Sequence, residues 1–461
     1  MLAISLGILV ATMGWGYLSS FWAAPGASTS DACRHVSSVR NHPAPKSRHR
    51  AQLAMFDAYA QDNHCPVATD PVYDIISKTL RPYNTTTGIT DEMIKDGYYI
   101  CRQTAFVEII NGTLNMVLKH GYQTTDHERA TWYFNFLSKF AHQLPDTRYV
   151  LNLMDEPCSW RAEMNDEDED AYGRRELGFD QAYRKYACDS NGMETLKHLH
   201  GFFINPETYS VTRAQLPVWS ANSVVGCFGD LLTPYSGGTV SFDSSTNCPP
   251  DDSIAFEDKT KVALFRGSST GGAARGIFAS PLGYSKFHRQ RLIEHVRALN
   301  RSDVDVGIVS WVQCDEAACV EQEQRYGKVD TMPQETIYSY AYHILVDGNG
   351  ALNRLANYLC SGSVPILSLV LDQWYHHALR PYKEYLPLDI DYTNLEEILD
   401  WLKVNKKKAA SIAQKAAEFA ESKLQDRVAG CFVFRQVVEY NALRRETPGF
   451  NWKSIEGVRV P

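Results

Sequence analysis

The segment from Lys261 to Gly272, K-V-A-L-F-R-G-S-S-T-G-G, has the composition of a phosphate-binding loop. Its apolar residues, Val262 to Phe265, predict a buried strand. The glycines that follow allow the tight turns that direct several backbone N–H groups at one anion. No lysine follows these glycines, so the segment is not a Walker loop. Arginine and backbone amides would hold the phosphate, which suits a nucleotide that acts as a leaving group.

A second pattern of this kind is I-L-V-D-G-N-G-A-L-N-R-L, from Ile344 to Leu355. Here a strand ends in a glycine-containing turn that opens a helix, predicted from Ala351 to Cys360. The free N–H groups of such a helix face the carboxyl edge of the sheet, where open α/β sheets bind ligands. Arg354 adds a charge that can form a fork with a diphosphate. An ordinary turn with a surface arginine is the alternative, but two such turns in one domain favour a nucleotide site.

Further arginines follow the first loop. Arg275 is within reach of a ligand bound at Ser268, which makes it a candidate ligand residue. The next helix carries H-R-Q-R, from His288 to Arg291, a pattern typical of a solvated helix face. We therefore assign Arg289 and Arg291 to the surface.

A candidate base follows a strand in the other half of the chain. Asp155 comes directly after the apolar run from Tyr149 to Met154 and before Glu156. A carboxylate at the end of a buried strand, partly shielded from water, can accept a proton from a hydroxyl nucleophile. A helix N-cap or a salt bridge is the alternative role. Glu156 would point the opposite way if the strand continued, so it is the less suitable base.

Two patterns that could bind a metal lack supporting ligands. The run from Asp166 to Asp170 contains overlapping D-x-D triplets, but arginines flank it and no apolar strand precedes it. A solvated loop is therefore expected there. His376 and His377 have no partners at metal-ligand spacing, and we assign them to the surface.

The elements that carry these motifs alternate between helix and strand. In the first half, a helical pattern begins near Ala51, and Thr125-x-x-Glu128 predicts a capping box for a helix that ends before Pro145. The second half predicts, in order, a helix at 286–300, strands at 306–312 and 344–346, a helix at 351–360 and a strand at 364–369. This alternation is typical of parallel α/β sheets.

A polar segment from Ser241 to Asp258 separates the two halves. Amphipathic helices at 395–404 and 407–424 would cover the second sheet, and a helix at 432–443 could cross back to the first. The pattern predicts an α/β fold of two Rossmann-like domains that face a cleft.

The bulk properties are those of a globular protein with more than one domain. The chain has 461 residues, of which 44% are hydrophobic and 22% charged, and this length is large for a single core. A net charge of −8 without a dominant basic stripe argues against nucleic acid as a partner.

The N-terminal residues predict entry into the secretory pathway. Residues 1–25 are apolar and carry no charged side chain, as in a signal peptide or a signal anchor, and their length favours the anchor of a single-pass type II membrane protein. Small residues at 23, 24 and 27 could support cleavage and secretion instead. Residues 26–50 are typical of a flexible stem.

Cysteines and sequons point to the same compartment. Eleven cysteines contain no C-x-x-C pair, so several disulfides are expected, with Cys314 and Cys319 close enough for a local loop. Sequons begin at Asn84, Asn111 and Asn300. Together these features favour the lumen of the ER or Golgi.

Taken together, these motifs resemble glycosyltransferase family 90, which includes capsule β-1,2-xylosyltransferases of fungi and protein O-glucosyltransferases of animals. F-R-G-S-S-T-G-G with H-R-Q-R resembles the fungal branch, and V-D-G-N-G-A-L-N-R-L resembles the second nucleotide motif of the family. N-L-M-D-E-P resembles the segment with the catalytic aspartate, and the stretch from Pro217 to Pro234 resembles the segment between. The likeness covers roughly residues 149–443.

The resemblance implies a GT-B fold, inversion at the anomeric carbon, a UDP-xylose or UDP-glucose donor, a glycan or glycoprotein acceptor, and no metal or other cofactor. It implies that Asp155 is the general base and that Asp230 contributes to the sugar or acceptor side. The residues that it assigns to the UDP moiety are Arg266, Gly267, Ser268, Thr270, Arg275, Asn349, Gly350, Ala351, Leu352, Asn353 and Arg354.

The expected domain plan follows from these assignments. Residues 51–255 would form the N-terminal Rossmann-like domain with the acceptor and the base. Residues 256–430 would bind the nucleotide sugar, and 431–461 would form a helix that packs back and a tail. A catalytically inactive lumenal protein that binds glycan or UDP is the main alternative, and a metal-dependent enzyme that uses the acidic run is a third.

Overall fold

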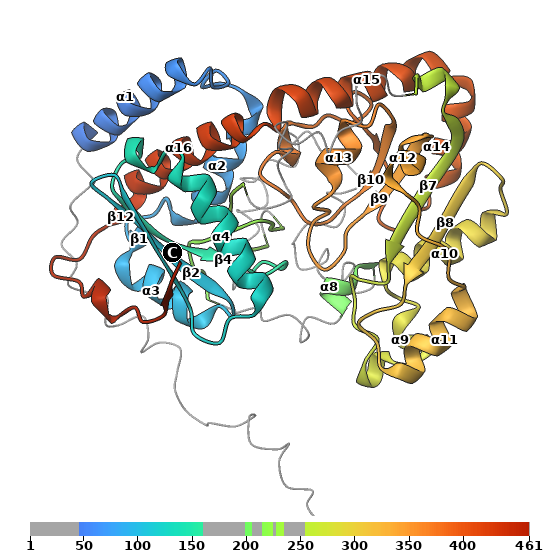
Figure 1. The fold of residues 1–461 in the computed structure, drawn as a ribbon, viewed down its shortest axis with the longest axis horizontal. Coiled ribbons are helices and arrows are strands. Elements are labelled where there is room, and N and C mark those ends of the chain that lie inside the picture. Colours follow the sequence, from blue (N-terminus) through green and yellow to red (C-terminus); the bar gives the residue numbers. More distant parts are fainter. Residues whose placement is uncertain (1–45, 160–198, 205–213, 225–226, 235–253, 461) are drawn as a thin grey trace, which may run out of the picture. The chain divides into compact units, whose positions relative to one another are not determined.

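The computed structural model describes residues 46–159, 199–204, 214–224, 227–234 and 254–460. The described part has a mixed α/β architecture (Figure 1), which confirms the predicted α/β class. Its two large sheets lie in two clusters of buried apolar residues. Residues Ala44–Pro461 form one compact unit, so the predicted division near residue 255 stays a prediction.

One large sheet is parallel throughout. Its strand order is β11-β10-β9-β7-β8, and every neighbouring pair in that order runs parallel. The strands are β7 (Thr260–Ser268), β8 (Val304–Ser310), β9 (Tyr340–Val346), β10 (Val364–Ser368) and β11 (Leu386–Pro387). The predicted strand at Val262 to Phe265 is confirmed. It continues further than expected, so Arg266, Gly267 and Ser268 lie in β7 rather than in a loop.

Four of the helices described in this half lie near predicted positions, whereas the helices Pro281–Tyr284, Glu316–Tyr326 and Gln334–Tyr338 are not predicted by the sequence patterns. α14 has the predicted bounds, and the amphipathic helix after it starts one residue early. The helices are α9 (Pro281–Tyr284), α10 (His288–Leu299), α11 (Glu316–Tyr326), α12 (Gln334–Tyr338), α13 (Leu355–Leu359), α14 (Leu395–Val404) and α15 (Lys406–Lys423). The start of α13 was predicted wrongly: the helix begins at Leu355, so the residues from Ala351 to Arg354 belong to an irregular turn.

The other large sheet is mixed, which corrects the expectation of a parallel sheet there. Its order is β13-β3-β2-β4-β5-β6; β4, β5 and β6 run parallel, while β2, β3 and β13 pair antiparallel. The reason is a hairpin at Asn111-Gly112, where φ is 49° and 73°, as two-residue hairpin turns require. The strands are β2 (Thr104–Ile110), β3 (Thr113–Leu118), β4 (Thr147–Asn152), β5 (Val218–Ser220), β6 (Leu231–Leu232) and β13 (Val458–Arg459).

Two helix starts in this half differ from the prediction. α1 begins at Lys46, so the last five residues of the expected stem are helical. α4 begins at Thr124, and its cap is the carboxylate of Asp126, which accepts from the backbone N–H of Gln123 at 2.8 Å. The helices are α1 (Lys46–Asp62), α2 (Asp74–Leu80), α3 (Asp91–Ile100), α4 (Thr124–Ser138) and α8 (Gly201–Ile204).

The last long helix, α16 (Asp426–Leu443), includes the predicted 432–443 helix and packs against α1 and α2, as Figure 1 shows. Short elements complete the described chain. They are β1 (Ile89–Thr90), β12 (Arg444–Arg445) and the 3₁₀ turns η2 (Pro71–Tyr73), η3 (Arg81–Tyr83), η4 (Ala141–Gln143), η6 (Phe256–Asp258), η7 (Gly276–Phe278), η8 (His376–Ala378) and η9 (Trp452–Ser454).

Disulfides join distant parts of the chain. Cys65, shortly after α1, pairs with Cys431 of α16, and Cys101 pairs with Cys158. Cys314–Cys319 closes the local loop that the spacing predicts. Cys227 and Cys360 are also disulfide-bonded.

Within the described residues, no helix is both long and apolar enough to cross a membrane. The apolar segment 1–25, for which an anchor or signal peptide is predicted, lies outside the described residues.

Candidate active site

The parallel sheet has a switch point between β7 and β9. From β7 the chain moves to β8 on one side and then crosses to β9 on the other. Ligands of open α/β sheets bind beyond the carboxyl ends of the strands at such a point. The two glycine-containing turns follow β7 and β9, so the topology brings both to this position.

A side chain assigned to the surface lies at the centre of this switch point. Arg289, on α10, is only 6% exposed, so its assignment to a solvated face is wrong. Its Nε donates at 2.9 Å to the carbonyl of Asp347, directly after β9. One terminal nitrogen donates at 2.8 Å to the carbonyl of Ser268, the last residue of β7. The same nitrogen donates to Oγ1 of Thr270 at 2.9 Å. Arg289 thus ties both strand ends together.

The charge of Arg289 is not neutralised by a hydrogen-bonded carboxylate within the described residues. Its hydrogen-bond acceptors in the described part of the chain are carbonyl and hydroxyl oxygens. Burial, followed by the nearby charge of Arg354, lowers the pKa of Arg289 to about 10. Two guanidinium groups close to each other repel, and a bound anion would relieve that repulsion. The pair is therefore suited to a phosphate or diphosphate.

The first turn requires glycine at one position. Gly271 has φ of +97°, and a β-carbon there would lie 2.2 Å from Cε1 of His288 and 2.8 Å from the carbonyl of Gly348. Its N–H donates to Oδ1 of Asn349 at 3.0 Å. The two predicted turns are thus in direct contact, as a shared ligand site needs.

The second turn is held from below by Asp347. This residue is fully buried, and its Oδ2 accepts from the backbone N–H groups of Val370 at 2.5 Å and Leu371 at 3.1 Å. After it, Ala351 is buried and Leu352 packs against the apolar core, whereas Asn353 and Arg354 are exposed. Arg354 is therefore the member of this turn that is most accessible to a ligand.

Two predicted ligand arginines bond to segments outside the two turns. Arg266 forms an ion pair of 2.6 Å with Asp305 on β8, and its side chain is largely buried. Arg275 is exposed, and its segment is bound to the loop after β8 because the N–H of Ala274 donates to Gln313 at 2.9 Å. In the described part of the chain, the side chains of Arg266 and Arg275 form no hydrogen bond with the two turns.

Asp155 lies beyond the carboxyl end of β4, as predicted. Its Oδ1 accepts from Arg129 of α4 at 2.5 Å, and its side chain is 37% exposed. Arg129 also donates to the carbonyl of Leu153 at 2.6 Å, so it holds both the backbone and the carboxylate. The salt bridge considered as an alternative role is therefore present. It leaves Oδ2 of Asp155 without a hydrogen-bond donor in the described part of the chain.

The base candidate contacts the second turn. A β-carbon at Gly350 would lie 2.1 Å from the carbonyl oxygen of Asp155, so the two backbones touch. The structure thus brings together the predicted base and the predicted phosphate site, which are almost 200 residues apart in the sequence.

Glu156 is a second carboxyl group at this end of β4 that is suited to proton transfer. β4 ends at Asn152, so the alternation of a strand does not apply to Glu156. Its Oε2 is buried and accepts no hydrogen bond. Burial, followed by the charge of Asp155, raises the pKa of Glu156 to about 7. A carboxyl group of that pKa can exchange protons at neutral pH.

Asp230 lies behind the site and is 1% exposed. Its carboxylate accepts from the backbone N–H groups of Cys158 at 2.9 Å and Ser159 at 2.7 Å, and from the hydroxyl of Ser220 at 2.5 Å. Burial raises its pKa to about 6. In this structure Asp230 holds the segment after Asp155, and its predicted role on the sugar or acceptor side stays a prediction.

Two sequence patterns, the acidic run 166–170 and the pair His376 and His377, were considered as metal ligands. The acidic run 166–170 lies outside the described residues. Elsewhere, the described chain contains no cluster of three His, Cys, Asp or Glu side chains that could hold a metal ion. His376 and His377 are 1% and 8% exposed, so their assignment to the surface is wrong.

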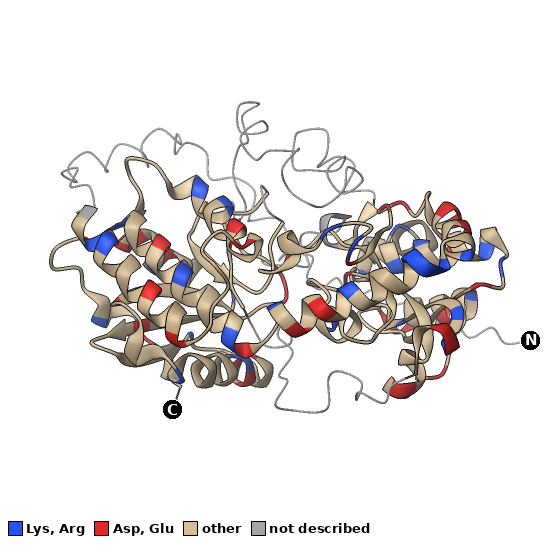
Figure 2. Cartoon of the chain, turned by 90° about the horizontal axis from the view of Figure 1, so that it is seen from above, with Lys and Arg blue, Asp and Glu red and all other residues tan. Residues whose placement is uncertain are grey.

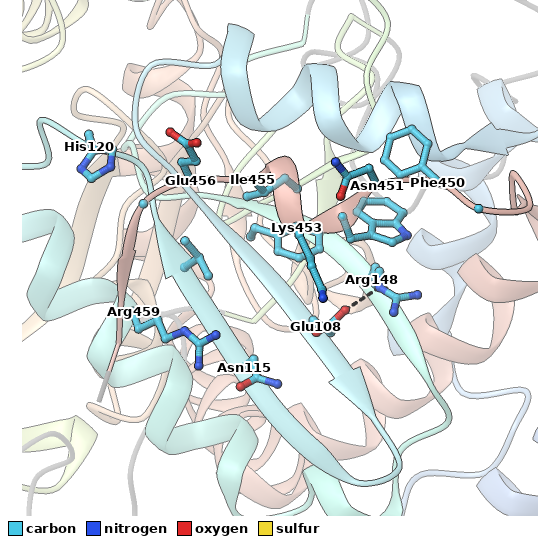
Figure 3. Close-up of a pocket in the computed structure, with 15 residues that line it drawn as sticks. Glu108, Asn115, His120, Arg148, Phe450, Asn451, Lys453, Ile455, Glu456 and Arg459 are labelled. Atoms are coloured by element: carbon cyan, nitrogen blue, oxygen red, sulfur yellow. Dashed lines mark hydrogen bonds and ion pairs between the residues drawn. The ribbon is translucent and has the colours of Figure 1, made fainter.

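Acidic and basic residues are interspersed along the described helices and strands, as Figure 2 shows. The candidate site is thus marked by the burial of Arg289 and not by a surface rich in one charge. A cavity of about 1050 Å³ lies elsewhere, on the mixed sheet beside the C-terminal segment (Figure 3). Its floor carries the Glu108–Arg148 ion pair, and its lining includes no residue of the two turns or of the Asp155 segment.

Comparison with known proteins agrees with the resemblance. Residues 251–456 match the family model described as Glycosyl transferase family 90. Human Protein O-glucosyltransferase 3 is 28% identical over 197 residues, which cover 41% of this chain and 34% of the relative. Human Protein O-glucosyltransferase 1 is 27% identical over 116 residues, 23% of this chain and 29% of the relative.

A viral relative matches a similar length. Uncharacterized protein 027R of Frog virus 3 (isolate Goorha) is 30% identical over 192 residues, which cover 37% of this chain and 19% of the relative. The matches thus span about a third or less of each of these relatives. The matched family range contains the parallel sheet, both turns and Arg289, while Asp155 lies before it. The chain therefore carries a glycosyl transferase family 90 domain in residues 251–456.

Proposed function

We propose that the protein is an inverting, metal-independent glycosyltransferase that moves xylose or glucose from a UDP-sugar to a hydroxyl group of a glycan or glycoprotein. The observation that carries the proposal is the contact between Asp155 and the turn at Gly350, next to the buried Arg289. A proton acceptor and an anion site lie side by side, as displacement of a nucleotide requires.

In the proposed reaction Asp155 takes the proton of the acceptor hydroxyl. The oxygen then forms a bond to the anomeric carbon on the face opposite UDP, and the bond from that carbon to the diphosphate oxygen breaks. UDP leaves with the electron pair. Arg289, Arg354 and the backbone amides near Gly271 would stabilise the charge that develops on the diphosphate.

Arg129 and Asp230 would act as supports in this reaction. Arg129 fixes Oδ1 of Asp155 and leaves Oδ2 for the acceptor hydroxyl. Asp230 orders the backbone directly after the base. Fixed geometry of this kind lowers the cost of reaching the transition state.

The proposal places the protein in the lumen of the ER or Golgi, with membrane attachment through residues 1–25. Disulfides such as Cys65–Cys431 are typical of an oxidising compartment. The sequon residues Asn84, Asn111 and Asn300 are all exposed, as glycan addition requires.

The test is UDP release by the full chain with a panel of UDP-sugars and a mixture of glycan and peptide acceptors, with and without EDTA. We expect acceptor-dependent UDP release with UDP-xylose or UDP-glucose, unchanged by EDTA. Loss of turnover with EDTA would support a metal-dependent enzyme instead. UDP binding without turnover on any donor would support the inactive binding protein.

A further inference from the structure

The side chain of Asn222 lies between the Asp155 segment and the second turn. It is 3% exposed and follows β5, whose neighbour in the sheet is β4. Its Nδ2 donates to the carbonyl of Asp155 at 2.6 Å, and its Oδ1 accepts from the N–H of Ala351 at 3.0 Å. One amide group thus bonds to both segments of the proposed site.

The backbone of Asn222 is fixed as well. The next residue, Ser223, forms an antiparallel bridge with Asp372, with N···O distances of 3.1 Å and 2.6 Å in the two directions. Leu371, beside Asp372, donates its N–H to the carboxylate of Asp347. The backbone beside Asn222 is therefore linked, through Asp372 and Leu371, to Asp347, which precedes the second turn.

The contact also depends on a glycine. A β-carbon at Gly350 would lie 2.8 Å from Nδ2 of Asn222, in addition to its overlap with the carbonyl of Asp155. Only a residue without a side chain allows the amide to approach both backbones. An amide is needed because it donates and accepts at once, whereas a carboxylate only accepts and an alkyl group does neither.

We infer that Asn222 is a positioning residue, which fixes the backbone of Asp155 against the donor turn at Gly350 and Ala351. This inference rests on the proposed function. Through the amide, the base keeps its distance from the anomeric carbon of a bound donor. A displacement of about 1 Å at such a site can lower the rate by about 100-fold.

The test compares Asn222→Ala and Asn222→Asp with the wild type and with Asn115→Ala, a control in the cavity of Figure 3. kcat at saturating donor and acceptor, the Kd for UDP and Tm are measured for each. We expect kcat to fall by about 10–100-fold in both Asn222 variants. In Asn222→Asp the bond from Ala351 can persist, so its Kd for UDP stays near that of the wild type.

The Kd for UDP and Tm show whether each variant is folded, and Asn222→Ser serves if Asn222→Ala does not fold. A purely structural role predicts equal losses of kcat and UDP affinity, or a lower Tm with normal kcat. If the wild type is active, either result overturns the inference about Asn222 and leaves the proposed function standing. Absence of wild-type turnover with every UDP-sugar overturns the proposed function and the inference with it.

Discussion

The carboxyl edges of the two sheets differ in charge. Beyond β7 and β9 lies a buried arginine whose pKa is lowered, next to a second arginine. Beyond β4 and β5 lie carboxyl groups, and burial raises the pKa of Glu156 and of Asp230. The first edge favours the binding of an anion, and the second favours proton transfer. In the proposed reaction, the two sheets would supply separate parts of the site, which meet at Gly350 and Asp155.

The largest effect should come from the proton acceptor. We expect Asp155→Asn to lower kcat by about 10²–10⁴-fold, the usual contribution of a general base. The Kd for UDP should change little, because the amide keeps the size of the side chain. Steady-state kinetics and calorimetric titration with UDP measure the two quantities. Turnover close to that of the wild type would remove Asp155 as the base.

Arg289→Lys should affect the other edge. Lysine cannot make the forked contacts to Ser268 and Asp347, so we expect the Kd for UDP to rise by about 10–100-fold, as for a lost charge-assisted bond of about 1.5–3 kcal/mol. The matched control is Arg297→Lys. Arg297 lies on the same helix, but it donates to the carbonyls of Arg325 and Tyr326 at the end of α11. An equal effect in both variants would contradict a specific role for Arg289.

Substitution of two exposed arginines, Arg354 and Arg275, should change the Kd for UDP by different and smaller amounts. Arg354 lies close enough to Arg289 to affect its pKa, so Arg354→Ala should raise the Kd for UDP by about tenfold, or about 1.4 kcal/mol. Arg275→Ala should change it by no more than about twofold, as for a surface substitution. The reverse order would show that Arg275 is the phosphate ligand, as the resemblance implies.

The smallest effect concerns stability and pH. The pKa of Glu156 is raised from 4.5 to about 7 on folding, so the folded state binds the proton more tightly. The resulting stability is fully present below about pH 4.5 and is lost as the pH rises through 7. Glu156→Gln mimics the protonated form. Its Tm should equal that of the wild type at pH 4 and exceed it at pH 8, by on the order of 2 °C. A lower Tm than wild type at pH 8 would contradict this account.

Local patterns predicted the second half of the chain well. The alternation of apolar strands and amphipathic helices placed β7 to β10 and gave α14 its bounds. The first half was predicted less well, although Asn111-Gly112 between two apolar runs is a strong hairpin signal. The same Asn111 also begins a sequon.

The site was only partly predictable for a physical reason. Asp155 and the two glycine-containing turns follow strands, so the sheet rule alone brings them to its edges. Arg289 and Asn222 acquire their roles from tertiary burial, which no local pattern encodes. A helix that begins H-R-Q-R gives no sign that its first residues lie against strand ends. The bonds of Asp230 to Cys158 and Ser159 likewise come from tertiary structure, because these residues are about 70 positions apart in the sequence.

The most direct test of the account is a crystal structure of the protein with UDP. We predict that the diphosphate lies against the backbone at Gly271, with Arg354 and the turn at Gly350 around it, above the buried Arg289. The Asp155 carboxylate would face the free side of the β-phosphate. UDP bound instead in the cavity beside Trp452 would contradict the central claim that the switch point between β7 and β9 is the donor site.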